Sequence, residues 1–364
     1  MTRSVLLTVS GTIPPGLDEA IEVGRRPRAD YRELARAFDA DILDYAEAAR
    51  GRGPGGRLLA RILGENVLLA WTCFRRRREH DVVFTDGEQV GLPFAALTWL
   101  TRRRPRHVMI GHRMSARKKV ALHRLLRLGR RVDRLVVYAS SQRRFAVDVL
   151  GYRPEQVHLT PFMVDTEFWR PDHVHVAHRE RPMICAVGQE LRDYPTLVEA
   201  VRGVDVHVVI AAASPWSKRA DTSASLDIPP NVEVRGFDLF ELRQLYADAS
   251  FVAVPLQDTD FQAGITTILE AMSMGKAVVC TQTAGQTDAI VEGENGVYVR
   301  PGDTQDLREA IERLLVDPGT AARLGKAGQR WVREHANLDV YAGRLAAVVD
   351  EAAERSRAAA SAPG

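Results

Sequence analysis

Residues 251–303, FVAVPLQDTDFQAGITTILEAMSMGKAVVCTQTAGQTDAIVEGENGVYVRPGD, predict a β-strand, a polar loop, a helix and a second strand. The first strand ends at Pro255, and the helix begins near Gly264 and stops at Gly275, a typical C-terminal cap. The loop between them therefore opens onto a helix N-terminus. Unpaired N–H groups and the helix dipole make such a place favourable for an anion, above all a phosphate.

Two residues of this unit suit a nucleotide. Gly264 has no side chain, so a ligand can approach its backbone closely. Glu270 lies in the second turn of the predicted helix, near enough to accept hydrogen bonds from ribose hydroxyls of a nucleotide held there. For the stretch in isolation, an N-terminal capping cluster followed by a solvated glutamate is the simpler interpretation.

Outside this unit, short apolar runs alternate with helical patterns along the whole chain. Several runs are apolar throughout, as in parallel strands that are covered on both faces. The alternation predicts a doubly wound α/β architecture. The other strands are expected at residues 4–9, 81–85, 107–110, 134–139, 157–160, 183–187, 206–211, 232–234, 277–280 and 297–299.

The length of 364 residues suggests two domains, and 45% hydrophobic with 27% charged residues is typical of a globular protein. Residues 170–182, RPDHVHVAHRERP, have prolines near both ends, many charges and weak periodicity, so we expect the linker there. This predicts an N-terminal domain over 1–170 and a C-terminal domain over 181–337. A last helix at 338–358 would precede a disordered tail at 359–364.

Several classes of protein are disfavoured by the composition. No apolar run reaches the roughly 18 residues that span a bilayer, and the first apolar run is too short for a secretory signal. The three cysteines are odd in number and far apart, which favours buried thiols in a reducing compartment. We therefore expect a cytoplasmic location. Zinc-ligand spacing and a P-loop are absent from the sequence, and we expect no metal site.

A fixed order of short motifs follows the predicted phosphate loop: Glu270-Ala271-Met272, Gly275, Val278-Val279, Glu294-Asn295-Gly296 and Pro301-Gly302-Asp303. This order resembles the nucleotide-sugar motif of retaining GT-B glycosyltransferases of the family 4 type, the glycosyl transferases group 1. The resemblance is specific over residues 231–317, extends over roughly 80–340, and is weak before residue 80. It implies two doubly wound, Rossmann-like domains that face a cleft, with the final helix returning to the first domain.

The resemblance also implies an activity: transfer of a sugar, with retention, from a nucleotide-diphosphate sugar to an acceptor hydroxyl, without metal or cofactor. His112 follows a predicted strand and corresponds to a histidine that faces the donor sugar; a loop histidine among basic residues is the alternative. The residues implied in donor binding are Gly11, Gly188, Arg192, Ala263, Gly264, Ile265, Thr266 and Glu270.

This sequence departs from the family pattern at three positions. Gln262 stands where the family has an acidic residue facing the donor sugar, and we predict a catalytic role for it by hydrogen bonding. Gln189 replaces an arginine, and Arg192 replaces a lysine while keeping a cation for the diphosphate. Lys218 is a candidate for a further cation. The changes mark either a subfamily or a weakened enzyme, and the intact residues around them favour a subfamily.

The basic charge lies mainly in the first half. Residues 1–170 carry 31 Lys and Arg against 19 Asp and Glu, whereas residues 171–364 carry 19 against 28. Family 4 enzymes with lipid-linked acceptors often have a basic first domain, so contact with an anionic membrane is one interpretation and a solvated surface the other. No recognisable nucleic-acid fold accompanies the charge. Asp86 and Glu88 end a predicted strand and are weak candidates for orienting the acceptor hydroxyl, with a solvated turn as the alternative.

Two other functions remain open from the sequence. One is another GT-B enzyme, such as a nucleotide-sugar epimerase, which the motif from Glu270 to Gly275 disfavours. The other is a nucleotide-binding or partner subunit with weakened catalysis, which Gln262 and Gln189 would suit. The acceptor class is open between a lipid-linked molecule and a small molecule.

Overall fold

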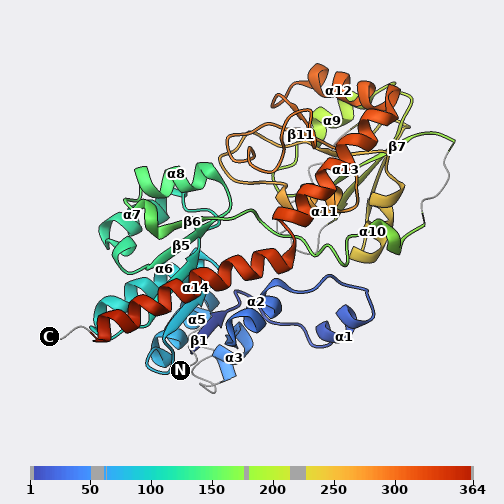
Figure 1. The fold of residues 1–364 in the computed structure, drawn as a ribbon. Helices are drawn as coiled ribbons and strands as arrows, with labels where there is room; N and C mark the ends of the chain where they lie inside the picture. The colour runs from blue at the N-terminus through green and yellow to red at the C-terminus, as the bar shows by residue number, and fades with distance from the viewer. Residues whose placement is uncertain (1–3, 51–60, 63, 176–179, 214–226, 362–364) are drawn as a thin grey trace. The chain divides into compact units, whose positions relative to one another are not determined.

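The computed structural model describes residues 4–50, 61–62, 64–175, 180–213 and 227–361. The chain divides into two compact units (Figure 1). The first unit comprises residues 1–17, 28–160 and 341–364, and the second comprises 18–27 and 161–340. Each unit is built around its own parallel sheet and is described separately below.

The sheet of the first unit has six parallel strands in the order β2-β1-β3-β4-β5-β6. The four residues of each of β1, β3 and β5 are buried, as expected for strands covered by helices on both faces. The strands are Val5–Thr8 (β1), Ala40–Leu43 (β2), Val82–Thr85 (β3), Arg106–Ile110 (β4), Arg134–Val137 (β5) and Val157–Leu159 (β6).

The helices of the first unit connect these strands, and the end of the chain contributes one more helix. They are Asp30–Phe38 (α2), Tyr45–Arg50 (α3), Glu65–Arg76 (α5), Glu88–Leu97 (α6), Arg117–Leu125 (α7), Ser140–Asp148 (α8) and, from Tyr341 onward, Leu338–Ser361 (α14). Short 3-10 turns follow at Thr98–Leu100 (η1), Leu128–Arg130 (η2) and Pro154–Gln156 (η3). Leu17–Glu22 (α1) crosses the boundary between the units.

The sheet of the second unit is also six-stranded and parallel, in the order β12-β11-β10-β7-β8-β9. Its strands are Met183–Val187 (β7), His207–Ala213 (β8), Val232–Gly236 (β9), Val252–Val254 (β10), Val278–Thr281 (β11) and Val297–Val299 (β12). Its helices are Pro171–His173 (η4, a 3-10 turn), Tyr194–Val201 (α9), Leu239–Asp248 (α10), Ile265–Ser273 (α11), Thr304–Val316 (α12) and Pro318–His335 (α13).

Each sheet reverses its winding direction at one point. In the first unit the chain passes from β1 to β2 on one side and then returns to β3 on the other side of β1. In the second unit it passes from β7 through β8 to β9 and then returns to β10 on the other side of β7. Ligands of open α/β sheets bind at the carboxyl ends of the strands beside such a reversal. The topology therefore places one candidate position after β1 and β3, and another after β7 and β10.

All eleven strands predicted from the sequence are present. The strand β2 was not predicted: it lies at the edge of its sheet, and its mixed exposure leaves no continuous apolar run. The division between the units falls at residues 160 and 161, upstream of the expected linker, and helix α14 continues to Ser361, beyond the expected end at 358. Residues 362–364 of the predicted tail lie outside the described part of the chain.

Candidate functional site

The loop that follows β7 carries the first two predicted donor-binding residues. Gly188 has φ 102°, and a Cβ atom there would lie 2.5 Å from Nη2 of Arg192, so only glycine fits over this guanidinium. Leu191 has φ 56°, in the left-handed region that side chains other than glycine rarely adopt. Its carbonyl accepts a hydrogen bond from the backbone N–H of Gln257 at 2.9 Å, which ties this loop to the one after β10.

The guanidinium of Arg192 is 5% exposed and makes three hydrogen bonds within the second unit. Nε donates to the carbonyl of Val187 at 2.8 Å, and Nη1 donates to that of Glu190 at 3.0 Å. Nη2 donates to Oγ1 of Thr267 at 3.0 Å. Because arginine has five N–H donors, two are left for a ligand.

Helix α11 begins at the loop after β10, as the sequence predicted. Gly264 precedes it with φ 77°, and a Cβ there would lie 2.9 Å from Val254. The same Cβ would lie 3.5 Å from Nη1 of Arg192, so the cation lies beside the start of the helix. The first N–H groups of a helix, here those of Ile265 and Thr266, have no partner within it. Cation and helix N-terminus together favour an anion at this edge of the sheet.

The turn after β11 holds the loop that precedes Gly264. Ala263 is buried, and its carbonyl accepts a hydrogen bond from Nε2 of Gln286 at 2.8 Å. At Gly285 a Cβ would lie 2.2 Å from the carbonyl oxygen of Phe261, so the turn after β11 packs directly on this loop. The turn after β11 thus helps to fix the conformation that starts α11.

Glu270 projects from α11 into a buried position, 8% exposed, where the Tyr246 hydroxyl donates to its Oε2 at 2.9 Å. Burial raises the pKa of Glu270 to about 8, and the Tyr246 hydrogen bond and the charge of Arg192 oppose this only in part. The alternative of a solvated glutamate is therefore wrong. The contact with Tyr246 could not be predicted from motif spacing, because α10 and α11 are brought together only by the tertiary structure.

Besides Arg192, the sequence departs from the family pattern at two positions, and both lie in loops of the second unit. Gln262 is 5% exposed and lies in the loop before α11. Gln189 is half-buried in the loop after β7. Lys218, the candidate for a further cation, lies outside the described residues.

At the carboxyl edge of the first unit, His112 follows β4 and is held by three contacts. Its backbone N–H donates to Oε2 of Glu88 at 2.8 Å, and its carbonyl accepts from Nε2 of Gln142 at 2.7 Å. Its ring Nε2 lies 2.9 Å from the carbonyl oxygen of Asp86. A carbonyl only accepts, so the Nε2–H group of His112 is the donor in this contact.

Asp86 holds the loop after β1. Its Oδ1 accepts from the hydroxyls of Thr8 at 2.7 Å and Ser10 at 2.8 Å, and its Oδ2 accepts from the backbone N–H of Ser10 at 2.5 Å. Gly11 follows in this loop, and a Cβ on it would meet nothing within 4 Å. The space beside Gly11 is therefore open in the first unit.

Glu88 is 2% exposed and is paired with Nζ of Lys119 at 2.5 Å. Burial acts to raise its pKa, but Lys119 and the N–H of His112 outweigh it, so the pKa of Glu88 is lowered and the group is ionised. Glu88 and Asp86 both hold protein loops that frame His112. The burial of Glu88 does not fit a solvated turn, and the orientation of an acceptor hydroxyl by these two residues stays a prediction.

One acidic residue near His112 escaped the sequence analysis. Asp30 begins α2, and burial together with the charge of Asp86 raises its pKa, while His112 lowers it. Nearby, the hydroxyls of Tyr138 and Tyr341 lie 2.8 Å apart, which joins the end of β5 to α14. Neither α2 nor α14 adjoins β4 in sequence, so spacing gave no signal for these neighbours.

The two winding reversals define two Rossmann-like units, and comparison with solved structures shows that the chain has the GT-B fold. An Anabaena protein, HepE, in complex with UDP-glucose superposes with a TM-score of 0.68 over 96% of this chain and 99% of that chain, at 15% identity. Residues 182–317 match the glycosyl transferases group 1 family. Over this part of the chain the protein is similar to group 1 glycosyltransferases.

Two curated relatives extend the similarity. A GDP-mannose-dependent alpha-(1-6)-phosphatidylinositol monomannoside mannosyltransferase of Mycolicibacterium smegmatis is 27% identical over 309 residues, 77% of this chain and 79% of the relative. An MMP alpha-(1->4)-mannosyltransferase of Mycolicibacterium hassiacum is 27% identical over 238 residues. That match covers 63% of this chain and 56% of the relative, so the chain spans about half the length of the second relative.

Proposed function

We propose that the protein transfers a sugar from a nucleotide-diphosphate sugar to an acceptor hydroxyl, with retention of configuration and without a metal ion or cofactor. The observation that carries the proposal is the start of α11, where the Arg192 guanidinium lies beside Gly264 at the winding reversal of the second sheet. A diphosphate suits this place because the cation and the helix dipole both stabilise its negative charge.

The donor-binding residues act in sequence along this edge. The N–H groups of Ile265 and Thr266 and the two remaining N–H donors of Arg192 bind the diphosphate oxygens. Glu270 accepts hydrogen bonds from the ribose hydroxyls, and Gln262 bonds to the sugar. As the bond to the sugar breaks, the leaving diphosphate gains charge, and these fixed donors stabilise that charge without rearranging.

His112 acts on the transferred sugar rather than on the nucleotide. Its ring is oriented by the Asp86 carbonyl, and its backbone is held by Glu88. Gly11, with open space at its Cβ position, permits close approach of the diphosphate to the loop after β1. In the described part of the chain no group of three or more His, Cys, Asp and Glu side chains has metal-binding geometry.

The comparisons suggest which substrates to try first. GDP-mannose is the donor named for one relative, and UDP-glucose is bound in one structural neighbour. We propose a phosphatidylinositol mannoside as the first acceptor to test, because the name of the same relative includes one, and we propose contact with a membrane surface through the basic first unit. None of the described helices has the length and apolar character needed to cross a membrane.

A second candidate, a nucleotide-binding subunit with weakened catalysis, is favoured by one observation. Gln262 is buried and neutral at the position where the family pattern has an acid. In that case the protein would bind the donor and release no nucleoside diphosphate. The two functions differ in turnover and not in binding.

The test is a panel of nucleotide sugars, led by GDP-mannose and UDP-glucose, with thermal unfolding as the first readout. A ligand at 100 times its dissociation constant stabilises by roughly 2.7 kcal/mol. Donors that stabilise the protein are then assayed for release of nucleoside diphosphate with phosphatidylinositol mannosides and with soluble sugars as acceptors. Glu270→Ala should abolish stabilisation by the donor, whereas the exposed control Glu309→Ala should not. Failure of every donor to stabilise the wild type would refute the proposal.

A further inference from the structure

The first unit contains a pocket of about 770 Å³ at the edge of its sheet opposite His112. The residues that begin β4 and β5 line it, whereas His112 follows the other end of β4. Five residues of strand separate the two ends by about 16 Å. Six arginines and one carboxylate line the pocket: Arg106, Arg124, Arg127, Arg130, Arg134, Arg153 and Asp133.

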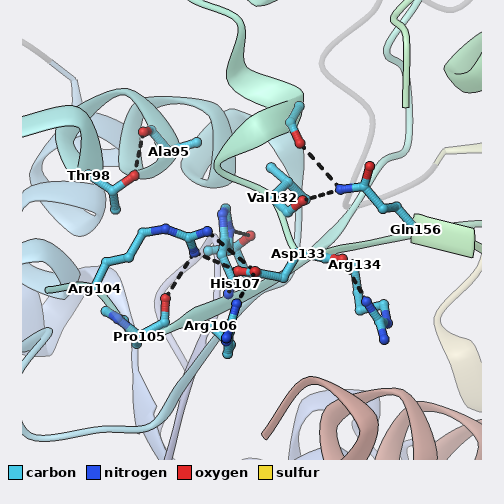
Figure 2. Close-up of polar contacts among 12 residues, drawn as sticks. Ala95, Thr98, Arg104, Pro105, Arg106, His107, Val132, Asp133, Arg134 and Gln156 are labelled. Atoms are coloured by element: carbon cyan, nitrogen blue, oxygen red, sulfur yellow. Dashed lines mark hydrogen bonds and ion pairs between the residues drawn. The ribbon is translucent and has the colours of Figure 1, made fainter. Parts of the chain in front are cut away.

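The one carboxylate is already neutralised. Oδ2 of Asp133 accepts from Nη1 of Arg104 at 2.5 Å, and its Oδ1 accepts from Nη1 of Arg106 at 3.0 Å, as Figure 2 shows. The backbone N–H of His107 donates to the same group at 2.8 Å. These contacts lower the pKa of Asp133 despite its burial, so it remains ionised and paired.

The positive charges of the other arginines are compensated less completely by carboxylates. Arg153 lies 3.3 Å from Glu155 in an exposed pair, and such surface pairs are weak. The buried Arg134 lies 3.5 Å from the exposed Glu351. Arg127 and Arg130 have no carboxylate within ion-pair distance among the residues that the structure describes. The pocket therefore has more cations than the described carboxylates of the first unit pair with.

His123 adds an unsatisfied polar group to the wall. It is 2% exposed and lines the pocket, yet neither Nδ1 nor Nε2 has a hydrogen-bond partner within the described chain. Its ring packs on Tyr152 with 5.1 Å between centroids. Burial and the charge of Arg124 lower the pKa of His123 to about 4, so at neutral pH the ring offers one donor and one acceptor. A buried polar group without a partner costs free energy that a ligand would recover.

We propose that this pocket is a second binding site of the protein, for a phosphate-bearing anion of the size of a diphosphate or a phosphorylated headgroup. Arginine binds phosphate oxygens through paired N–H groups, and several arginines around one cavity match the charge of such a ligand. The His123 N–H supplies a further donor from the wall. The site lies in the first unit at the sheet edge opposite His112, whereas the donor edge belongs to the second unit, and the transfer reaction does not require the pocket.

The probes are inorganic pyrophosphate and vesicles of phosphatidylcholine with or without phosphatidic acid. The pocket variant is the double substitution Arg127→Gln and Arg130→Gln, which should weaken pyrophosphate binding at least tenfold in calorimetry. The matched control is Arg75→Gln with Arg78→Gln, which removes the same charge from exposed positions of the first unit outside the pocket and should bind as the wild type does.

A third variant, His123→Phe, keeps the ring on Tyr152 and removes both nitrogens. It should raise the unfolding temperature of the free protein, because two unsatisfied atoms are lost, and reduce the stabilisation by pyrophosphate. Loss of phosphatidic-acid vesicle binding in the pocket variant would identify a lipid headgroup as the source; loss for pyrophosphate alone would identify a soluble ligand. Equal binding by the pocket variant and the control in both assays would overturn the proposal. It would indicate that pyrophosphate binds only at the start of α11 or not at all.

Discussion

The buried carboxyl of Glu270 gives the sharpest test of the donor site. In the folded protein its pKa is about 8, raised by burial from the usual value near 4.5. The substitution Glu270→Gln keeps the shape and the acceptor for the Tyr246 hydroxyl while removing the titration. The variant therefore separates the charge of Glu270 from its packing.

The sign of the effect on stability follows from the protons bound in each state. Between pH 4.5 and about 8 the unfolded chain has lost the proton of Glu270 that the folded protein keeps, so the wild type loses stability as pH rises through this window. Each unit of pKa difference corresponds to about 1.4 kcal/mol, so the total effect is on the order of a few kcal/mol. The variant lacks this titration, so its free energy of unfolding should increase relative to that of the wild type as pH rises.

The assay is the free energy of unfolding in urea for both proteins from pH 5 to pH 8.5. We expect near-equal stability at pH 5 and a more stable variant at pH 8.5, with Glu309→Gln, an exposed position in the same unit, showing no such trend. At pH 8.5, where Glu270 is ionised, donor affinity should fall in Glu270→Gln by roughly tenfold, because a neutral amide accepts ribose hydrogen bonds more weakly than a carboxylate. A stability difference that is flat with pH would refute the buried, protonated carboxyl.

Three further predictions concern the other site residues. Arg192→Lys should lower affinity for nucleoside diphosphate more than for nucleoside, measured by calorimetry, because the three donors of lysine cannot replace the contacts to Val187 and Thr267 and also bind phosphate; equal losses would place the residue elsewhere. His112→Ala should lower turnover on the order of 100-fold while nucleoside diphosphate binding is kept; surviving turnover would contradict its role. Gln262→Ala should reduce transfer, and Gln262→Glu should at best be tolerated; a gain of transfer in Gln262→Glu would instead indicate a decayed enzyme.

Much of the fold was predictable because buried parallel strands are continuous apolar runs. The eleven predicted strands include β7 and β10, and from these alone the loops at 188–193 and 257–264 fall at the carboxyl edge of one sheet. The glycine at 264 marks the start of α11 because only a residue without a side chain fits beside Val254 with positive φ. Local rules of this kind operate over a few residues and are visible in a sequence.

What escaped prediction depends on contacts between distant segments. The carboxylates of Asp86 and Glu88 hold the loops after β1 and β4, which the sequence did not indicate. The arginine pocket joins residues from 106 to 156 with Ala352, and in the sequence its members are dispersed in one long basic tract. Charge counting cannot distinguish a solvated arginine from one that lines a cavity, since that difference arises only from packing.

The replacements at positions 189 and 192 are best understood together. The family pattern has two cations in this loop, and here one side chain, Arg192, both secures the loop through Val187, Glu190 and Thr267 and keeps two N–H donors for a ligand. A lysine has too few donors for both tasks. Burial also holds Arg192 in one orientation before any ligand arrives, so little conformational entropy is lost on binding. We propose that this rigid cation offsets the missing cation at position 189, as a functioning subfamily requires; the turnover of the Gln262 variants distinguishes that case from a decayed enzyme.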